Sequence, residues 1–114
     1  MSDLKALSIQ VQPHRAPGLD IERLRALITR IESTPLVERS HFEDGIDEVE
    51  YSNFTLGTRD LKALWATIRA EVYGDPTLGE LVSRSSIATC EGSHGWDDYL
   101  LLHHFDPKVR RDQL

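Results

Sequence analysis

Apolar and polar residues alternate near both ends of the chain, with the period of two that is typical of β-strands. The alternation predicts a strand over residues 4–12. It predicts two more strands over residues 86–91 and 98–105, which residues 92–97 join into a hairpin. Both ends of the chain are therefore expected to contribute to one sheet.

Between these segments, apolar residues at helical spacing predict two main helices, over residues 20–32 and 59–73. Asp20 is placed to cap the first helix, and Thr58 is placed to cap the second. Residues 77–83 add a short third helix, because a Thr and a Glu three residues later have the spacing of a capping box.

The segment between the two main helices, residues 36–56, predicts a β-hairpin. Its turn signal is Asp44-Gly45, since both residue types tolerate the positive φ angles of a tight two-residue turn. The apolar positions change phase along the second strand. We therefore expect a bulge near Ser52-Asn53.

The resulting order, β-α-β-β-α-(short α)-β-β, predicts an α+β fold. The expected architecture is a two-layer sandwich with a ferredoxin-like βαββαβ core, an antiparallel sheet, two main helices on one face and an additional C-terminal strand. A length of 114 residues fits one domain over residues 1–114. The polar segment 106–114 is expected to fray.

Composition places the chain among ordinary globular proteins, with 39% hydrophobic and 28% charged residues. The first residues lack the pattern of a secretory leader, and the longest apolar run is 99–102, so we expect a cytoplasmic protein without a membrane partner. The lone cysteine, Cys90, excludes an internal disulfide framework and any multi-cysteine zinc site.

The formal net charge is −6, and it is concentrated in residues 41–50, which hold five acids and no Lys or Arg. The rest of the chain is nearly balanced, with 13 basic and 14 acidic residues. The negative balance argues against a nucleic-acid partner, which needs a basic surface. The five acids are Glu43, Asp44, Asp47, Glu48 and Glu50.

Three interpretations of these five acids stay open. They form a solvated face that protects an edge strand from aggregation, or a surface that binds a basic protein partner, or a calcium site. The last is disfavoured because the spacing does not reproduce the calcium-binding loop of helix-loop-helix proteins.

A second polar cluster lies in residues 90–106, which hold the cysteine, three of the five histidines and one of the two tryptophans. If the loop spans residues 92–97, the carboxylates of Glu91 and Asp98 face each other across the hairpin, which is unfavourable unless a proton, a cation or a donor lies between them. The weak catalytic candidates are Glu91, His94, Asp98, His103 and His104.

The adjacent histidines His103 and His104 point to opposite faces of a strand and cannot easily bind one metal ion together. We therefore expect no metal and no cofactor, and a structural role is the competing interpretation for each histidine. Convergence of the candidates in one pocket would favour an enzyme, whereas positions on two sheet faces would favour a binding module.

The chain lacks the common motifs for dinucleotides, P-loop phosphates, serine hydrolysis and helix-borne zinc. The leading hypothesis is a small acidic protein-binding module: an inhibitor, immunity-type or regulatory partner of a basic protein surface. One alternative is a small enzyme or a ligand- or metal-binding protein that uses residues 90–106. Another is a homo-oligomeric structural domain, a homodimer with an aromatic face of Tyr51, Phe54, Tyr99 and Phe105.

Overall fold

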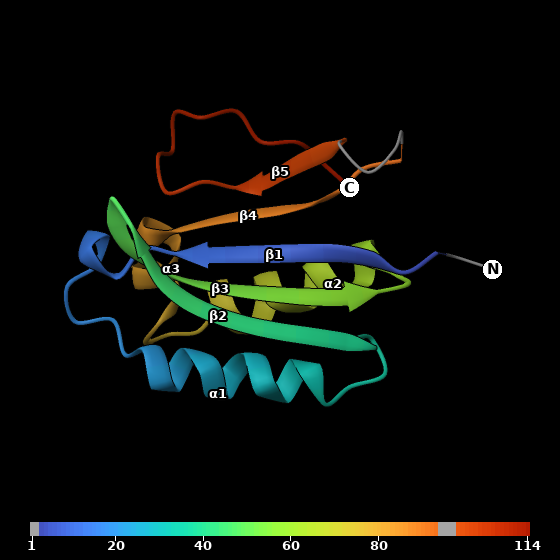
Figure 1. The fold of residues 1–114 in the computed structure, drawn as a ribbon, viewed down its shortest axis with the longest axis horizontal. Helices are drawn as coiled ribbons and strands as arrows, with labels where there is room; N and C mark the ends of the chain where they lie inside the picture. Colours follow the sequence, from blue (N-terminus) through green and yellow to red (C-terminus); the bar gives the residue numbers. More distant parts are fainter. Residues whose placement is uncertain (1–2, 94–97) are drawn as a thin grey trace.

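The structure, a computed structural model, describes residues 3–93 and 98–114. In this part of the chain, five antiparallel strands form one sheet in the order β2-β3-β1-β4-β5 (Figure 1). The strands are β1 (Lys5–Val11), β2 (Arg39–Asp47), β3 (Val49–Thr58), β4 (Ser86–Glu91) and β5 (Tyr99–His103). The helices are η1 (Pro13–Arg15), α1 (Ile21–Glu32), α2 (Leu61–Ile68), η2 (Arg69–Tyr73) and α3 (Gly79–Ser85). The predicted α+β class is confirmed.

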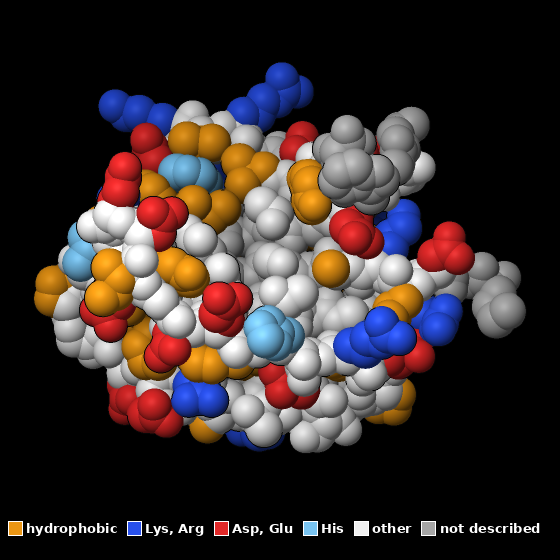
Figure 2. Space-filling model, viewed as in Figure 1, with side chains coloured by type: hydrophobic (Ala, Val, Ile, Leu, Met, Phe, Trp, Pro, Cys, Tyr) orange, Lys and Arg blue, Asp and Glu red, His pale blue; other side chains and the backbone are white. Residues whose placement is uncertain are grey.

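The hydrophobic core lies on one face of β1, the central strand. Leu7, Ile9 and Val11 have no exposed surface, and they belong to one cluster with the buried residues of α1, α2 and η2. The alternate residues Ser8 and Gln10 stay half-buried on the other face. They line a shallow hollow over the sheet, whose centre is largely white in Figure 2 because few charged side chains lie there. The alternation of β1 thus separates a buried face from a polar, open one.

Both main helices begin at an aspartate. The predicted cap of α1 is confirmed, because Asp20 Oδ1 accepts a hydrogen bond from the Arg23 amide at 3.1 Å. The predicted cap of α2 is wrong, since Asp60 Oδ1 accepts from the Ala63 amide at 3.0 Å instead. Thr58 is the last residue of β3 and is buried, so the chain reaches its first helical turn only two residues later.

The predicted helix over 59–73 divides into the α-helix α2 and the π-helical segment η2. The third helix begins at Gly79, two residues after the predicted start. Before it, the Asp75 carboxylate accepts hydrogen bonds from the amides of Leu78 at 2.7 Å and Thr77 at 3.0 Å. These bonds, that of Leu78 above all, hold the pKa of Asp75 below its usual value. Asp75 therefore organises the turn that the threonine was expected to cap.

The turn of the β2–β3 hairpin lies at Glu48, not at Asp44-Gly45 as the sequence predicted. Asp47 pairs with Val49, and Glu48 has a φ of 59°. Gly45 lies inside β2 opposite Tyr51, and a Cβ at Gly45 would come within 2.7 Å of the Tyr51 hydroxyl. The glycine thus provides room for a cross-strand aromatic side chain rather than for a turn.

The bulge expected near Ser52-Asn53 is also absent from the described pairing. Strand β3 pairs without interruption with β1 on one side and β2 on the other. Ser52 is 5% exposed and occupies an inward-facing position in register with Phe54 and Leu56. The apparent change of phase arises because a buried serine interrupts the apolar series while the backbone remains regular.

Candidate functional site

The C-terminal hairpin has a different register from the predicted one. Glu91 pairs with Tyr99, and an irregularity between Ala88 and Thr89 shifts the far end of β4 against β5. The Gly92 amide donates to the Asp98 carbonyl oxygen at 2.6 Å and closes the pairing before the loop. The expected juxtaposition of the Glu91 and Asp98 carboxylates is therefore wrong.

Two of the catalytic candidates, Glu91 and His103, lie on opposite faces of the sheet. Glu91 alternates with the buried residues of β4 and therefore faces the open side of the sheet, where its Oε2 accepts from the Ala6 amide at 3.2 Å. His103 points the other way, because its Nε2 contacts the Ser83 carbonyl oxygen of α3 at 2.8 Å. His94 lies outside the described residues.

The remaining candidate histidine is engaged locally. His104 Nδ1 accepts from the Asp106 amide at 3.0 Å, and the His104 ring lies 4.2 Å from that of Phe105. Across residues 3–93 and 98–114, three or more His, Cys, Asp or Glu side chains nowhere come close enough together to hold a metal ion. Glu91 and His103 therefore lie on two faces of the sheet and do not share one pocket.

Cys90 also lacks the surroundings of a nucleophile. The side chain is 1% exposed within the core cluster, and burial raises the pKa of the thiol. A buried thiol in apolar surroundings stays protonated near neutral pH and acts as a small hydrophobic side chain.

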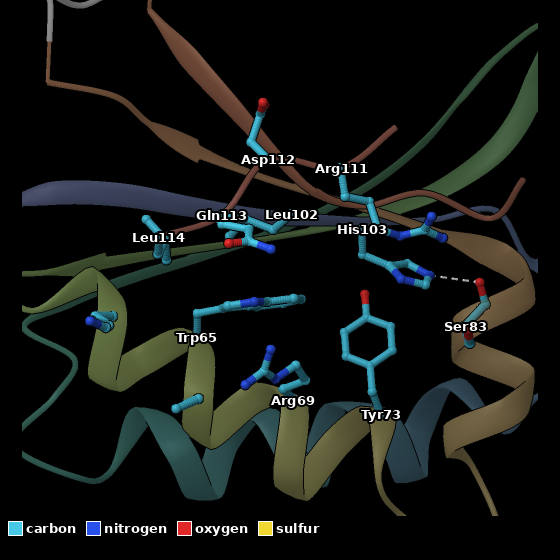
Figure 3. Close-up of a pocket in the computed structure, with 12 residues that line it drawn as sticks. Trp65, Arg69, Tyr73, Ser83, Leu102, His103, Arg111, Asp112, Gln113 and Leu114 are labelled. Carbon is cyan, nitrogen blue, oxygen red and sulfur yellow. Dashed lines mark hydrogen bonds between the residues drawn. The ribbon is translucent and has the colours of Figure 1, made fainter. Parts of the chain in front are cut away.

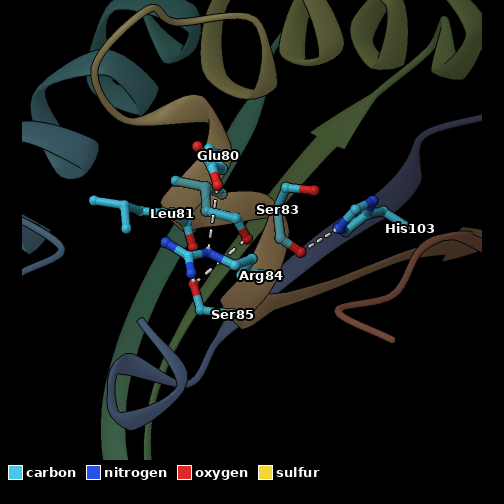
Figure 4. Close-up of polar contacts among 7 residues, drawn as sticks. Glu80, Leu81, Ser83, Arg84, Ser85 and His103 are labelled. Carbon is cyan, nitrogen blue, oxygen red and sulfur yellow. Dashed lines mark hydrogen bonds and ion pairs between the residues drawn. The ribbon is translucent and has the colours of Figure 1, made fainter. Parts of the chain in front are cut away.

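His103 is the last residue of β5, and its side chain contacts Ser83 of α3 and Tyr73 of η2. Its ring centroid is 4.6 Å from that of Tyr73, and Figure 4 shows its hydrogen bond to Ser83 at the end of α3. Because a carbonyl oxygen only accepts, His103 Nε2 carries the hydrogen in this contact. Burial lowers the pKa of His103; the hydrogen bond to Ser83 opposes this in part, and the positive charge of Arg111 adds to the lowering. The structure therefore stabilises the neutral imidazole.

This environment predicts a loss of stability in mildly acidic solution. In the unfolded chain His103 titrates near its ordinary pKa of about 6.5, and in the folded protein the pKa is lower. Below pH 6.5 the unfolded state therefore binds more protons, and the free energy of unfolding falls as the pH falls. Urea unfolding between pH 7.5 and 5 measures this slope. We expect His103→Gln to flatten it, and an unchanged slope in that variant would contradict the assignment.

The five acids of the β2–β3 hairpin do not share one face. Because paired residues lie on the same side of a sheet, Glu43 and Asp47 share a face with Asn53 and Val49, while Asp44 and Glu50 occupy the other. Glu48 occupies the turn between them. The negative charge therefore surrounds the end of the hairpin instead of covering one side of it.

This end also projects beyond the neighbouring strand. The pairing of β1 with β3 stops at Ser52, so residues 45–51 pair only with each other (Figure 1). Ile46 in this overhang is 82% exposed, the largest value among the large hydrophobic side chains that the structure describes. Figure 2 shows acidic side chains beside apolar ones at this end. We call residues 43–50 the acidic tip.

A cavity of about 690 Å³, which sequence reasoning missed, lies between α2, η2, α3, β5 and the tail (Figure 3). Its lining includes Trp65, Arg69 and Tyr73, whose spacing of four residues places them on one helical face. That spacing was available in the sequence. The contribution of His103 and Arg111 was not, because it depends on the path of the chain after β5.

The comparisons with known proteins give no further assignment. The chain matches no protein-family model, no curated protein and no solved structure. In the part of the chain that the structure describes, every helix is too short or too polar to cross a membrane.

Proposed function

We propose that this protein is a small protein-binding module, an inhibitor, immunity-type or regulatory partner, whose acidic tip docks on a basic protein surface. The observation that carries the proposal is the exposed Ile46 in an overhanging hairpin end that is surrounded by carboxylates. The carboxylates would steer a basic surface and fix its orientation, and the isoleucine would enter an apolar depression between the partner's Lys and Arg side chains.

The surroundings of the carboxylates support this interpretation. Among the described residues, the one contact of the five acids with a basic side chain is that of Glu43 Oε2 with His41 Nε2, at 3.8 Å. The other four side chains are exposed and belong to no ion pair in the described chain. Their negative charge is therefore not neutralised by ion pairs within the described chain and is available to a partner.

Neutralising the acidic tip tests the proposal. A variant with Glu43→Gln, Asp47→Asn, Glu48→Gln and Glu50→Gln should lose the partner that the wild-type protein captures from a lysate of its own source cells. Ile46→Ser should weaken the same capture. The captured protein should be rich in Lys or Arg by mass spectrometry, and added salt should release it, since exposed charges are screened within about 10 Å at 0.1 M ionic strength.

The matched control removes the same number of charges from the helices. Its substitutions are Glu22→Gln, Glu32→Gln, Glu71→Gln and Glu80→Gln, all at positions outside the acidic tip. This variant should retain the partner. If both variants capture it equally, or if capture is insensitive to salt, the acidic tip is not the docking surface.

We also infer that the architecture is a ferredoxin-like βαββαβ core with α1 and α2 on one face of the sheet. The strand order β2-β3-β1-β4, with β5 added beside β4, supports this inference. So does the single core cluster that joins the buried side chains of both helices with those of β1. In this arrangement β2 is an edge strand, which leaves the acidic tip accessible from outside the sheet.

A further inference from the structure

The cavity between α2, η2, α3, β5 and the tail has the dimensions of a small-molecule site. Its volume of about 690 Å³ lies in the range of pockets that enclose small organic ligands, about 300–1,000 Å³. The segment η2 that contributes to its wall is π-helical. This conformation is rare in proteins, and where it occurs it is often at a functional site. None of the residues that line it belongs to the acidic tip.

One part of the cavity wall consists of three rings. The Trp65 and Tyr73 centroids are 5.7 Å apart with an interplanar angle of 66°, and the Tyr73 and His103 centroids are 4.6 Å apart. The Tyr73 hydroxyl is hydrogen-bonded to Ser86 at 2.8 Å, and burial raises its pKa, so the phenol is neutral. With a neutral imidazole beside it, this wall is uncharged and aromatic, and it suits a planar ring.

Three cationic side chains line the same cavity as this aromatic wall. Figure 3 shows Arg69 and Arg111 on opposite sides of the cavity, and Lys62 also lines it. The lining contains one acidic side chain, Asp112, whose Oδ2 accepts from the Leu101 amide at 2.8 Å. In a chain of net charge −6, the lining side chains therefore carry a positive excess.

The fold holds one of these cations in place without neutralising it. Arg111 donates to the carbonyl oxygens of His104 at 2.9 Å and Val109 at 3.1 Å. These acceptors are uncharged, so they fix the guanidinium while its positive charge remains. Within the described chain, neither Lys62 nor Arg69 forms an ion pair. The charge of all three residues is thus left for an anion.

We propose that this cavity binds a small planar aromatic molecule that bears an anionic group, a carboxylate or a phosphate. The ring packs against Trp65 and Tyr73, and the anionic group accepts charge-assisted hydrogen bonds from Arg69, while the positive charges of Arg111 and Lys62 attract it to the cavity. Binding of this ligand is separate from protein docking at the acidic tip, because the two sites share no residue. An experiment can therefore disprove one proposal and leave the other unaffected.

The test is a titration of ¹⁵N-labelled protein followed by NMR. Indole-3-carboxylate and adenosine monophosphate are the anionic probes, and indole-3-carboxamide and adenosine are their neutral counterparts. At least one anion should cause saturable shifts at the Trp65 indole and at the amides of Leu102 and His103. Its neutral counterpart should bind about tenfold more weakly or worse, as expected for a lost charged hydrogen bond. The anion that binds distinguishes a carboxylate from a phosphate ligand.

Arg69→Gln is the decisive variant, because Arg69 is exposed and its replacement leaves the core intact. It should weaken binding of the anion by about tenfold. Arg84→Gln is the control, since Arg84 in α3 is exposed, lies outside the cavity lining and forms one ion pair in the described chain, with Glu80 at 3.9 Å (Figure 4). The proposal is overturned if neither anion binds at these residues, if the neutral molecules bind equally well, or if Arg69→Gln has no effect.

Discussion

Replacing Ile9 by Ala is expected to destabilise the protein by about 2–5 kcal/mol, the cost of emptying a fully buried aliphatic position. Ile9 lies in the central strand β1, has no exposed surface and pairs with Phe54 on one side and Ala88 on the other. All three side chains are buried in the core cluster, so the shorter side chain leaves a cavity in a packed region. Urea unfolding at neutral pH measures the loss.

The chain supplies a matched control in a second strand isoleucine. Ile46 is 82% exposed, so Ile46→Ala should change the free energy of unfolding by less than about 0.5 kcal/mol. The pair of variants separates the two roles that we assign to isoleucine in this protein, core packing and partner contact. Equal losses in the two variants would contradict the described burial of the sheet.

Gly79→Ala is the second substitution with a large expected effect. Helix propensity alone predicts a gain of at most about 1 kcal/mol, the value for a helix interior, because Gly79 is the first residue of α3. A Cβ there would, however, overlap the carbonyl oxygen of Tyr73, which belongs to the backbone and cannot rotate away. We expect the steric term to exceed the propensity term and to leave a net loss of about 1–3 kcal/mol in urea unfolding.

The neighbouring position provides the control for this prediction. Glu80 is exposed, and its one ion pair in the described chain is the 3.9 Å contact with Arg84. Glu80→Ala should therefore change stability by less than about 0.5 kcal/mol. If Gly79→Ala stabilises the protein, the close approach of α3 to the end of η2 is not present in solution.

The elements were predictable where a local sequence pattern determined the structure. The alternation around Ile9 predicted β1, and Asp20 predicted the start of α1. The turn signal Asp44-Gly45 failed because glycine has two uses, and here it makes room for Tyr51. Periodicity cannot distinguish these uses, since the difference depends on the side chain of the opposite strand.

The candidate site was predictable only in part. The concentration of acids was visible in the sequence, but their distribution around the hairpin end follows from a turn at Glu48, where the φ of 59° is unusual for a glutamate. The cavity was not anticipated because it needs contacts that are distant in the sequence. His103 contacts Ser83 twenty residues earlier, and Arg111 folds back on His104.

The most direct test of the central claim is to locate where a basic ligand binds on this protein. We suggest a titration of ¹⁵N-labelled protein with a hexalysine peptide at low and at physiological salt. Our account predicts amide shift changes concentrated in residues 43–50 and strongly reduced by salt. Shift changes of equal size at the exposed acids of α1 and α3, or none at residues 43–50, would contradict the assignment of the acidic tip as the docking surface.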